Sequence, residues 1–245
     1  MKTMILILSL FMNSGVLLAG KAIDYSISGE SFSGYYEKAK TKPKGNVIVI
    51  HDWDGLTDYE IKRVNMLADQ GYNAFAIDLY GKNVRPVETN MKKEQTAKLY
   101  QNRLRMRQLI IGGLKQAREI FPGAFFVMGY CFGGAATLEL ARSQGAQGIS
   151  GYATFHGGLS TPKGQSYKDS APIFIAHGGA DSSITLDDVA SIGKELEGAK
   201  ITYEIEIYSG APHAFTVIGS ERYDRDADEK SWRSLLAFMQ KHRKT

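Results

Sequence analysis

The only cysteine of this sequence, Cys131, lies in the motif Gly-Tyr-Cys-Phe-Gly-Gly at residues 129–134. An apolar run over residues 124–128 precedes the motif, and a helix-like pattern over residues 135–141 follows it. A side chain with small residues two positions before and after it, between a strand and a helix, is typical of the sharp turn that exposes a nucleophile. The motif therefore predicts that Cys131 attacks a substrate.

Two further residues supply the partners that a thiol nucleophile needs. Asp181 follows a predicted strand at residues 173–176, and His213 follows another at residues 202–208. Because the carboxyl ends of parallel strands meet at one edge of a sheet, we expect both side chains to lie near Cys131. The histidine can take the thiol proton, while the carboxylate fixes the histidine tautomer and stabilises its charged form.

Attack on a carbonyl group also requires donors for the negative charge that develops on the carbonyl oxygen. We expect the backbone N–H of Phe132, at the start of a helix, to be one donor. The second should come from the loop after the predicted strand at residues 47–50, with the N–H of Trp53 as the candidate. The same helix start favours the thiolate through its positive end.

Other assignments of these residues stay open. His51, His156 and His177 also lie at predicted strand ends, so one of them could serve as the base in place of His213. A lone cysteine beside glycines can also be a small residue of the core.

Two acidic groups elsewhere are assigned to helix starts. Asp187 and Asp188 open a helical pattern, where carboxylates cap the helix and offset its dipole. Residues 224–228 imitate a calcium-binding loop, but the turn glycine is missing and Leu235 stands where the bidentate glutamate belongs. We interpret residues 224–228 as a solvated helix entrance, and we predict no metal site.

Strands and helices that can position these residues alternate along the chain. We expect an antiparallel hairpin over residues 23–40, strands at residues 47–50, 74–79, 124–130, 149–155, 173–176 and 202–208, and helices at residues 59–70, 134–143, 186–196 and 228–242. One long helix is expected over residues 91–120, weakened at Gly112 and Gly113, and residues 157–170 form a loop. The predicted fold class is α/β, with a mostly parallel sheet of about eight strands and helices on both faces.

Length and charge narrow the possible functions. A chain of 245 residues without a linker or an internal repeat fits one such domain, which we place at residues 23–245. The formal net charge is +4, and both signs are spread along the sequence. This distribution gives no sign of a nucleic-acid partner.

The N-terminus has the composition of a secretory signal. A basic start, an apolar run over residues 4–12 and small residues near Ala22 predict a signal peptide over residues 1–22, with Ala19 or Gly20 as alternative cleavage points. The protein would then be exported, periplasmic or secreted, with no stable membrane insertion after cleavage. The alternative is an uncleaved anchor that makes a membrane-attached esterase.

Several motifs together resemble the dienelactone hydrolase family of the α/β-hydrolase superfamily, from about residue 33 to the C-terminus. They are the cysteine motif, His-Gly-Gly-Ala-Asp at 177–181, Ala-Pro-His-Ala-Phe at 211–215, Ile-His-Asp-Trp-Asp-Gly-Leu at 50–56 and Ala-Ile-Asp-Leu-Tyr-Gly at 76–81. The order nucleophile, acid, histidine is also that of the superfamily. The resemblance implies hydrolysis of a small ester or lactone through a Cys-acyl intermediate, without a cofactor, and we expect a monomer.

The resemblance also implies roles for two other residues. Asp52 stands where the family has an acid that holds the resting thiol and helps to activate it. Lys93 best matches one of two substrate-binding arginines, and Val217 stands in place of the other, four residues after His213. Since Lys cannot reproduce the bidentate clamp of Arg, a substrate other than the dienelactone is expected. The alternative function is a non-catalytic binding or thiol-redox protein on a hydrolase frame.

Overall fold

The computed structural model describes residues 20–143 and 145–244. The strands are β1 (Lys21–Ile27), β2 (Glu30–Glu37), β3 (Asn46–Ile50), β4 (Asn73–Ile77), β5 (Phe125–Tyr130), β6 (Ile149–Phe155), β7 (Ile173–Gly178) and β8 (Tyr203–Tyr208). The helices are α1 (Asp58–Asp69), α2 (Thr89–Gln101), α3 (Arg103–Ile120), α4 (Phe132–Ser143), α5 (Leu186–Gly198) and α6 (Arg225–His242).

The eight strands form one sheet in the order β1-β2-β4-β3-β5-β6-β7-β8. β3 to β8 run parallel, and the expected hairpin of β1 and β2 adds an antiparallel edge next to β4. Every residue of β3, β5, β6 and β7 is buried. Near-continuous burial of this kind is typical of parallel strands that helices cover on both faces. The predicted fold class is confirmed.

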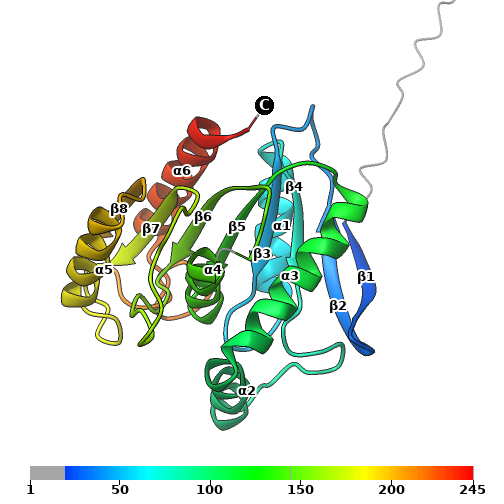
Figure 1. The fold of residues 1–245 in the computed structure, drawn as a ribbon, viewed down its shortest axis with the longest axis horizontal. Coiled ribbons are helices and arrows are strands. Elements are labelled where there is room, and N and C mark those ends of the chain that lie inside the picture. Colours follow the sequence, from blue (N-terminus) through cyan, green and yellow to red (C-terminus); the bar gives the residue numbers. More distant parts are fainter. Residues whose placement is uncertain (1–19, 144, 245) are drawn as a thin grey trace, which may run out of the picture.

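Two hydrophobic clusters form the core, one on each face of the sheet. In one cluster, strand residues such as Ile48 pack against apolar residues of α3, α4 and α5. In the other, strand residues such as Val47 pack against α1 and α6. Figure 1 shows α3, α4 and α5 in front of the sheet, with α1 and α6 behind it. Successive side chains of a strand point to opposite faces, which is why Val47 and Ile48 belong to different clusters.

The long helix expected over residues 91–120 is wrong, because the structure has two helices there, α2 and α3. The break lies at Asn102, whose side chain accepts a hydrogen bond from the N–H of Arg105 and so caps α3. Gly112 and Gly113 lie inside α3, where a Cβ atom would stand 2.5 Å from Ile27 or 2.7 Å from Ile77. These glycines therefore allow α3 to approach the sheet and do not weaken the helix.

Most of the predicted signal peptide lies outside the described residues. Lys21 and Ala22 belong to β1, where they pair with Tyr36 and Tyr35. Within residues 20–143 and 145–244, no helix is both long and apolar enough to cross a bilayer.

Candidate active site

Cys131 occupies the sharp turn between β5 and α4. Its φ of 48° lies in the left-handed region that non-glycine residues rarely adopt. The strand and the helix approach closely at this turn. A Cβ atom added at Gly129 would stand 2.2 Å from the carbonyl oxygen of Gly133, and a Cβ atom added at Gly133 would stand 2.3 Å from the carbonyl oxygen of Ile50. The glycines of the motif are thus required by the backbone that presents Cys131.

The structure brings Cys131, His213 and Asp181 together. The Nε2 atom of His213 lies 3.3 Å from the Sγ atom of Cys131, and its Nδ1 atom lies 2.7 Å from the Asp181 carboxylate. Burial pushes the pKa of Asp181 upward, but its hydrogen bonds with His213 and with backbone N–H groups bring the pKa below its usual value. Asp181 therefore stays ionised and can hold a proton on Nδ1 of His213, which leaves Nε2 facing the sulfur.

Cys131 is a protonated thiol in this arrangement. Burial, together with the negative charge and a hydrogen bond of Asp52, raises the pKa of the thiol well above its usual value. The N–H of Phe132 acts in the opposite direction, as does the charge of Arg222. Asp52 thus lies within hydrogen-bonding reach of Cys131.

The two expected oxyanion donors differ in what they contact. The N–H of Phe132, the first residue of α4, faces the sulfur of Cys131. The N–H of Trp53 donates a hydrogen bond to the carboxylate of Asp52. The Trp53 donor is therefore occupied by a carboxylate of the protein while the thiol is at rest.

A second buried acid lies behind Asp52. Glu60 of α1 is 0% exposed and accepts hydrogen bonds from the N–H of Asp52 and from both the N–H and the hydroxyl of Thr57. Burial raises the pKa of Glu60 to about 8 and that of Asp52 to about 6. Glu60 also forms the capping box of α1 with Thr57, so the helix start and the loop of Asp52 are one unit.

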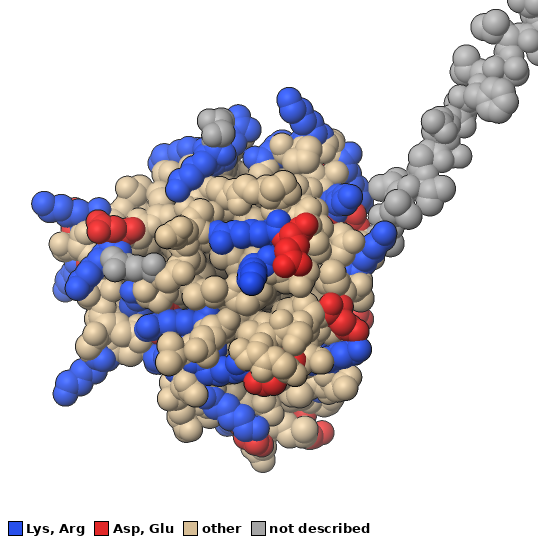
Figure 2. Space-filling model, turned by 45° about the vertical axis from the view of Figure 1, so that its right-hand side comes forward, with Lys and Arg blue, Asp and Glu red and all other residues tan. Residues whose placement is uncertain are grey.

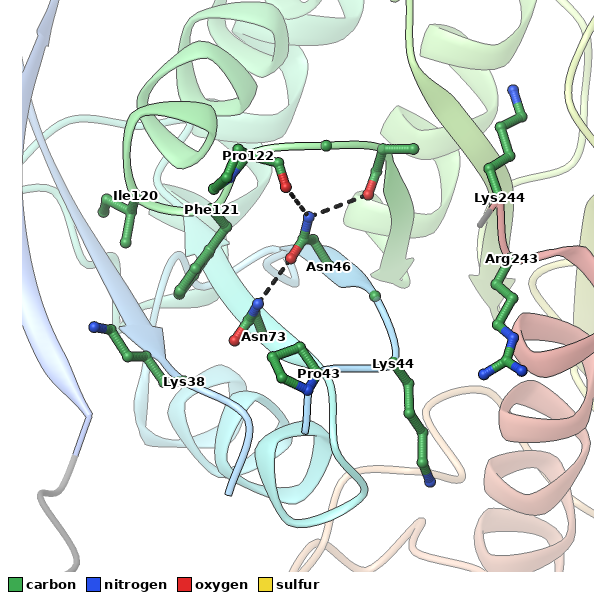
Figure 3. A pocket seen from close by; sticks show the side chains of 13 residues that line it. Lys38, Pro43, Lys44, Asn46, Asn73, Ile120, Phe121, Pro122, Arg243 and Lys244 are labelled. Atoms are coloured by element: carbon green, nitrogen blue, oxygen red, sulfur yellow. Dashed lines mark hydrogen bonds between the residues drawn. The ribbon is translucent and has the colours of Figure 1, made fainter. Parts of the chain in front are cut away.

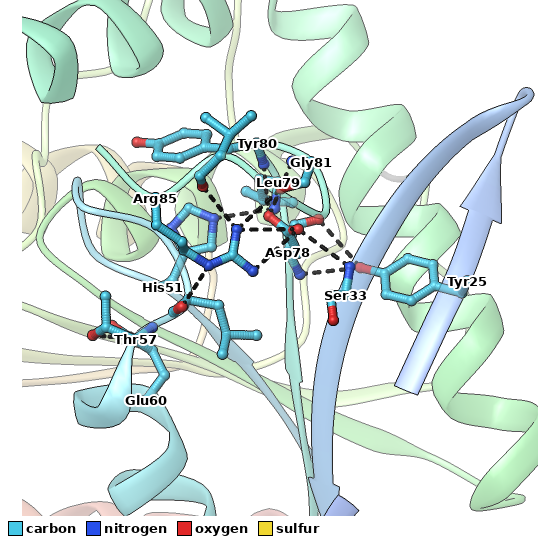
Figure 4. Close-up of polar contacts among 12 residues, drawn as sticks. Tyr25, Ser33, His51, Thr57, Glu60, Asp78, Leu79, Tyr80, Gly81 and Arg85 are labelled. Atoms are coloured by element: carbon cyan, nitrogen blue, oxygen red, sulfur yellow. Dashed lines mark hydrogen bonds and ion pairs between the residues drawn. The ribbon is translucent and has the colours of Figure 1, made fainter. Parts of the chain in front are cut away.

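His51 and the Asp78 carboxylate make hydrogen bonds in the loops that follow β3 and β4 (Figure 4). The Nδ1 atom of His51 lies 2.6 Å from the carbonyl oxygen of Asp52, and its Nε2 atom accepts a hydrogen bond from the N–H of Leu79. The carboxylate of Asp78 accepts from the N–H of Tyr80 and pairs with Arg85. Both ring nitrogens of His51 are engaged with backbone, so it cannot act as the base.

The other two alternative bases are buried. His156 and His177 are each 1% exposed, and burial lowers the pKa of both. In the described part of the chain, His213 is the histidine whose ring nitrogen lies within hydrogen-bonding distance of Cys131.

Aromatic rings and one lysine contact the two residues that carry the expected oxyanion donors, Phe132 and Trp53. The rings of Tyr80 and Tyr100 pack against Phe132, and the Tyr80 hydroxyl donates to the carbonyl of Trp53. Lys92 of α2 places its ammonium 5.3 Å from the Trp53 ring centroid. No local sequence pattern indicates these contacts, because they join segments that only the fold brings together.

Lys93, the lysine expected from the resemblance, lies on the exposed side of α2. Lys92 instead has a half-buried side chain that also pairs with Asp54 at 3.6 Å. Neighbouring helix residues point in directions about 100° apart, so a shift of one residue decides which lysine faces the site.

The two predicted helix starts differ in their environment. Asp188 forms a capping box with Thr185, as expected for the first turn of α5. Asp224 caps α6, but Asp228 is 4% exposed and pairs with the buried Arg63 at 2.6 Å. The expectation that residues 224–228 are solvated is therefore wrong for Asp228, which packs into the core side of α6.

A basic cavity lies at the opposite end of the sheet. It encloses about 750 Å³ near the amino ends of β3, β4 and β5, and Figure 3 shows Lys38, Lys44, Arg243 and Lys244 around Asn46. Figure 2 likewise shows Lys and Arg without Asp or Glu along the upper edge of the molecule. Among the described residues, its lining contains no Cys, Ser, Thr, His, Asp or Glu side chain.

Comparisons with known proteins agree with the fold and the motifs. The model of the dienelactone hydrolase family matches residues 32–243. A provisionally assigned carboxymethylenebutenolidase of Aquifex aeolicus is 24% identical over 92% of this chain and 100% of its own length. A provisionally assigned 2-oxo-3-(5-oxofuran-2-ylidene)propanoate lactonase of Bradyrhizobium is 27% identical over 90% of this chain and 93% of its own length.

Solved structures give the same result. A dienelactone hydrolase-like promiscuous phosphotriesterase from metagenomic libraries superposes with a TM-score of 0.81 at 24% identity, covering 91% of this chain and 98% of that chain. A provisionally assigned dienelactone hydrolase of Klebsiella pneumoniae superposes with a TM-score of 0.74 at 26% identity, covering 90% and 98%. The fold of this chain therefore matches that of both solved structures over at least 90% of each chain.

Proposed function

This chain belongs to the dienelactone hydrolase family, and from that premise we propose that it hydrolyses an ester or lactone bond of a small molecule by attack of Cys131. The observation that carries the proposal is the position of His213, with Nε2 at 3.3 Å from Sγ of Cys131 and Nδ1 at 2.7 Å from Asp181. A base that reaches the thiol, and that a buried carboxylate orients, is the arrangement that nucleophilic catalysis requires.

The reaction begins with transfer of the thiol proton to His213. The sulfur then attacks the carbonyl carbon, and the C=O electron pair moves onto the oxygen, which the N–H groups of Phe132 and Trp53 stabilise. The C–O bond breaks, and the leaving alkoxide takes the proton from His213. His213 then deprotonates a water molecule, which attacks the carbonyl carbon of the Cys131 thioester. The C–S bond breaks, and the released thiolate recovers the proton from His213.

Asp52 controls when this sequence starts. Its carboxylate accepts a hydrogen bond from the Trp53 N–H and raises the pKa of Cys131, so the resting enzyme has a neutral thiol and a filled oxyanion site. A substrate carbonyl that displaces Asp52 from Trp53 would free the N–H of Trp53. At the same time it would weaken the effect of Asp52 on the pKa of the Cys131 thiol. We propose that substrate binding activates Cys131 in this way.

The substrate class follows from the family and the walls of the site. The relatives named above are assigned to carboxymethylenebutenolide and to an oxofuranylidene propanoate, which are unsaturated lactones. The rings of Tyr80 and Tyr100, which pack against Phe132 next to Cys131, fit a planar, unsaturated acyl group. We propose a small ester or lactone of this kind as the substrate, with Lys93 or its neighbour Lys92 near its polar end.

The same proposal includes export of the protein. The composition of residues 1–22 supports a signal peptide, so the hydrolase would act in the periplasm or outside the cell. A thiol-redox role has less support, because the thiolate is the reactive form and the Cys131 thiol is held protonated.

The test is hydrolysis of activated phenyl esters and unsaturated lactones by the wild type, Cys131→Ala and Cys131→Ser. We expect Cys131→Ala to lose turnover by at least about a thousandfold while its circular dichroism and melting temperature match the wild type. Cys131→Ser keeps a weaker nucleophile in the same place and should retain a small residual rate. Wild-type turnover by folded Cys131→Ala would rule out the proposed nucleophile.

A further inference from the structure

Behind His213, a chain of buried hydrogen bonds runs from an arginine to a second histidine. Arg63 of α1 is 0% exposed, and its Nε donates to the phenol oxygen of Tyr59 at 3.3 Å. The Tyr59 hydroxyl lies 2.6 Å from Oγ1 of Thr216, and that Oγ1 lies 2.8 Å from Nε2 of His156. The chain thus passes through Thr216, three residues after His213.

The arginine gives this chain a direction. A guanidinium group can only donate, so the Tyr59 oxygen accepts from Arg63 and must pass its own proton on. In the direction that we infer, the acceptor of this proton is Oγ1 of Thr216, which lies 2.6 Å from the Tyr59 oxygen. The Thr216 hydroxyl, which accepts from Tyr59, then donates to Nε2 of His156.

One tautomer of His156 follows from this direction. If its Nε2 accepts from Thr216, a neutral ring carries its proton on Nδ1, a buried atom that has no hydrogen-bond partner among the described residues. Burial and then the positive charge of His213 lower the pKa of His156 well below its usual value, so the ring stays uncharged. It packs edge to face against His213, with 5.2 Å between the ring centroids. An uncharged neighbour supports the His213 ring and does not repel its protonated form.

The same arginine contacts the loop that carries His213 and the end of β5 before Cys131. Its Nη2 donates to the carbonyl of Thr216 at 2.7 Å and to the Asp228 carboxylate at 2.6 Å. Its Cζ lies 5.4 Å from the ring centroid of Tyr130, the residue before Cys131. Arg63 therefore joins the loop that carries His213 to the strand end that carries the thiol.

We propose that Arg63, Tyr59 and Thr216 are positioning residues, which hold His156 as its Nδ1–H tautomer and, through His156, set His213 against Cys131. The inference rests on the proposed function, because it concerns the base of that reaction. None of the three touches the thiol. Their effect should therefore appear in kcat, while KM stays near its wild-type value.

The variant Tyr59→Phe tests the proposal by removing one hydroxyl at constant ring size. In the wild type, the ¹⁵N spectrum of His156, assigned through its contact with the Phe215 ring, should show the Nδ1–H tautomer. In Tyr59→Phe, the Thr216 hydroxyl can donate or accept, so both tautomers should appear. We expect kcat to fall about tenfold, as displaced catalytic groups commonly cause.

Tyr167→Phe is the matched control. Tyr167 is also buried, and its phenol oxygen accepts from a buried arginine, Arg142, at 2.8 Å, in a network without a hydrogen bond to the His213 loop. Its kcat and the His156 spectrum should stay as in the wild type. An equal loss of kcat in Tyr167→Phe would overturn the proposal, since the loss would then reflect general destabilisation of the fold by removal of a buried hydroxyl.

Two other results would also overturn it. An Nε2–H tautomer in the wild type would contradict the direction of the chain, and wild-type kcat in Tyr59→Phe would contradict the positioning role. The tautomer measurement needs no substrate. The tautomer therefore decides the direction of the hydrogen-bond chain even if the Cys131→Ala variant keeps its activity and the proposed hydrolytic mechanism is wrong.

Discussion

The carboxylate of Asp52 accepts a hydrogen bond from the N–H of Trp53, the residue that follows it. The same carboxylate raises the pKa of the Cys131 thiol. One side chain therefore acts on both the proposed nucleophile and a predicted oxyanion donor. Activation of the thiol and opening of the oxyanion site become a single event if Asp52 moves.

The variant Asp52→Asn should make the resting thiol more reactive. Removing the negative charge lowers the pKa of Cys131, so a larger fraction is thiolate at neutral pH. The measurement is the rate of alkylation by iodoacetamide against pH, with Asp54→Asn as a control for general loss of negative charge. The reasoning fails if Asp52→Asn leaves the apparent thiol pKa unchanged or raises it.

Lys92 and Lys93 provide a paired test of the substrate end of the site. Lys92 contacts the Trp53 ring, whereas Lys93 faces solvent. We expect Lys92→Gln to change KM by about two- to fivefold, the worth of one cation–π contact, and Lys93→Gln to leave KM unchanged. The opposite pattern in steady-state kinetics would support the family alignment that points to Lys93.

Glu60 should make the stability of the fold fall as pH rises. Its pKa is raised from 4.5 to about 8, so the folded state binds a proton that the unfolded chain has already released in this interval. The stabilisation is complete below about pH 4.5 and is lost as the pH passes about 8.

Urea unfolding of the wild type and Glu60→Gln measures this effect. The stability difference between the two should shrink over this interval by at least about 1.4 kcal/mol, the value of one pKa unit. Thr185→Ala, which removes a cap far from Asp52, should keep a constant difference from the wild type. A constant difference for Glu60→Gln as well would show that Glu60 binds the same number of protons in the folded and unfolded states over this interval, so that its pKa is not raised by folding.

The mature N-terminus should lie at Gly20 or Lys21, which corresponds to cleavage after Ala19 or Gly20. β1 begins at Lys21, and cleavage after Ala22 would remove two residues that pair with β2. Sequencing of the protein recovered from the periplasm or the medium checks this. A protein that keeps Met1 and sediments with membranes would support the anchored alternative.

The sequence predicted the strands and the approach of the three site residues for a physical reason. Apolar runs identify buried parallel strands, and residues just beyond their carboxyl ends converge on one edge. Cys131 and His213 are 82 residues apart in the chain, yet this rule alone places them together. The glycines of the cysteine motif marked the close strand–helix contact that the structure shows.

The parts that the sequence did not predict depend on contacts between distant segments. Arg63 and Asp228 are 165 residues apart, and nothing local distinguishes them from surface charges. Local sequence does not indicate the break at Asn102, because glycine is the stronger local signal for the end of a helix. The packing of α3 against the sheet instead favours Gly112 inside the helix. The contact of Lys92 with Trp53 likewise required the orientation of α2.

The most direct test of the central claim is to trap the acyl group on the thiol. The wild type is mixed with p-nitrophenyl acetate, quenched in acid within one turnover and digested for mass spectrometry. We predict one acetyl group on the peptide that contains Cys131, and none in Cys131→Ala. Stoichiometric acetylation at another residue, or steady turnover with Cys131 unmodified throughout, would contradict the account.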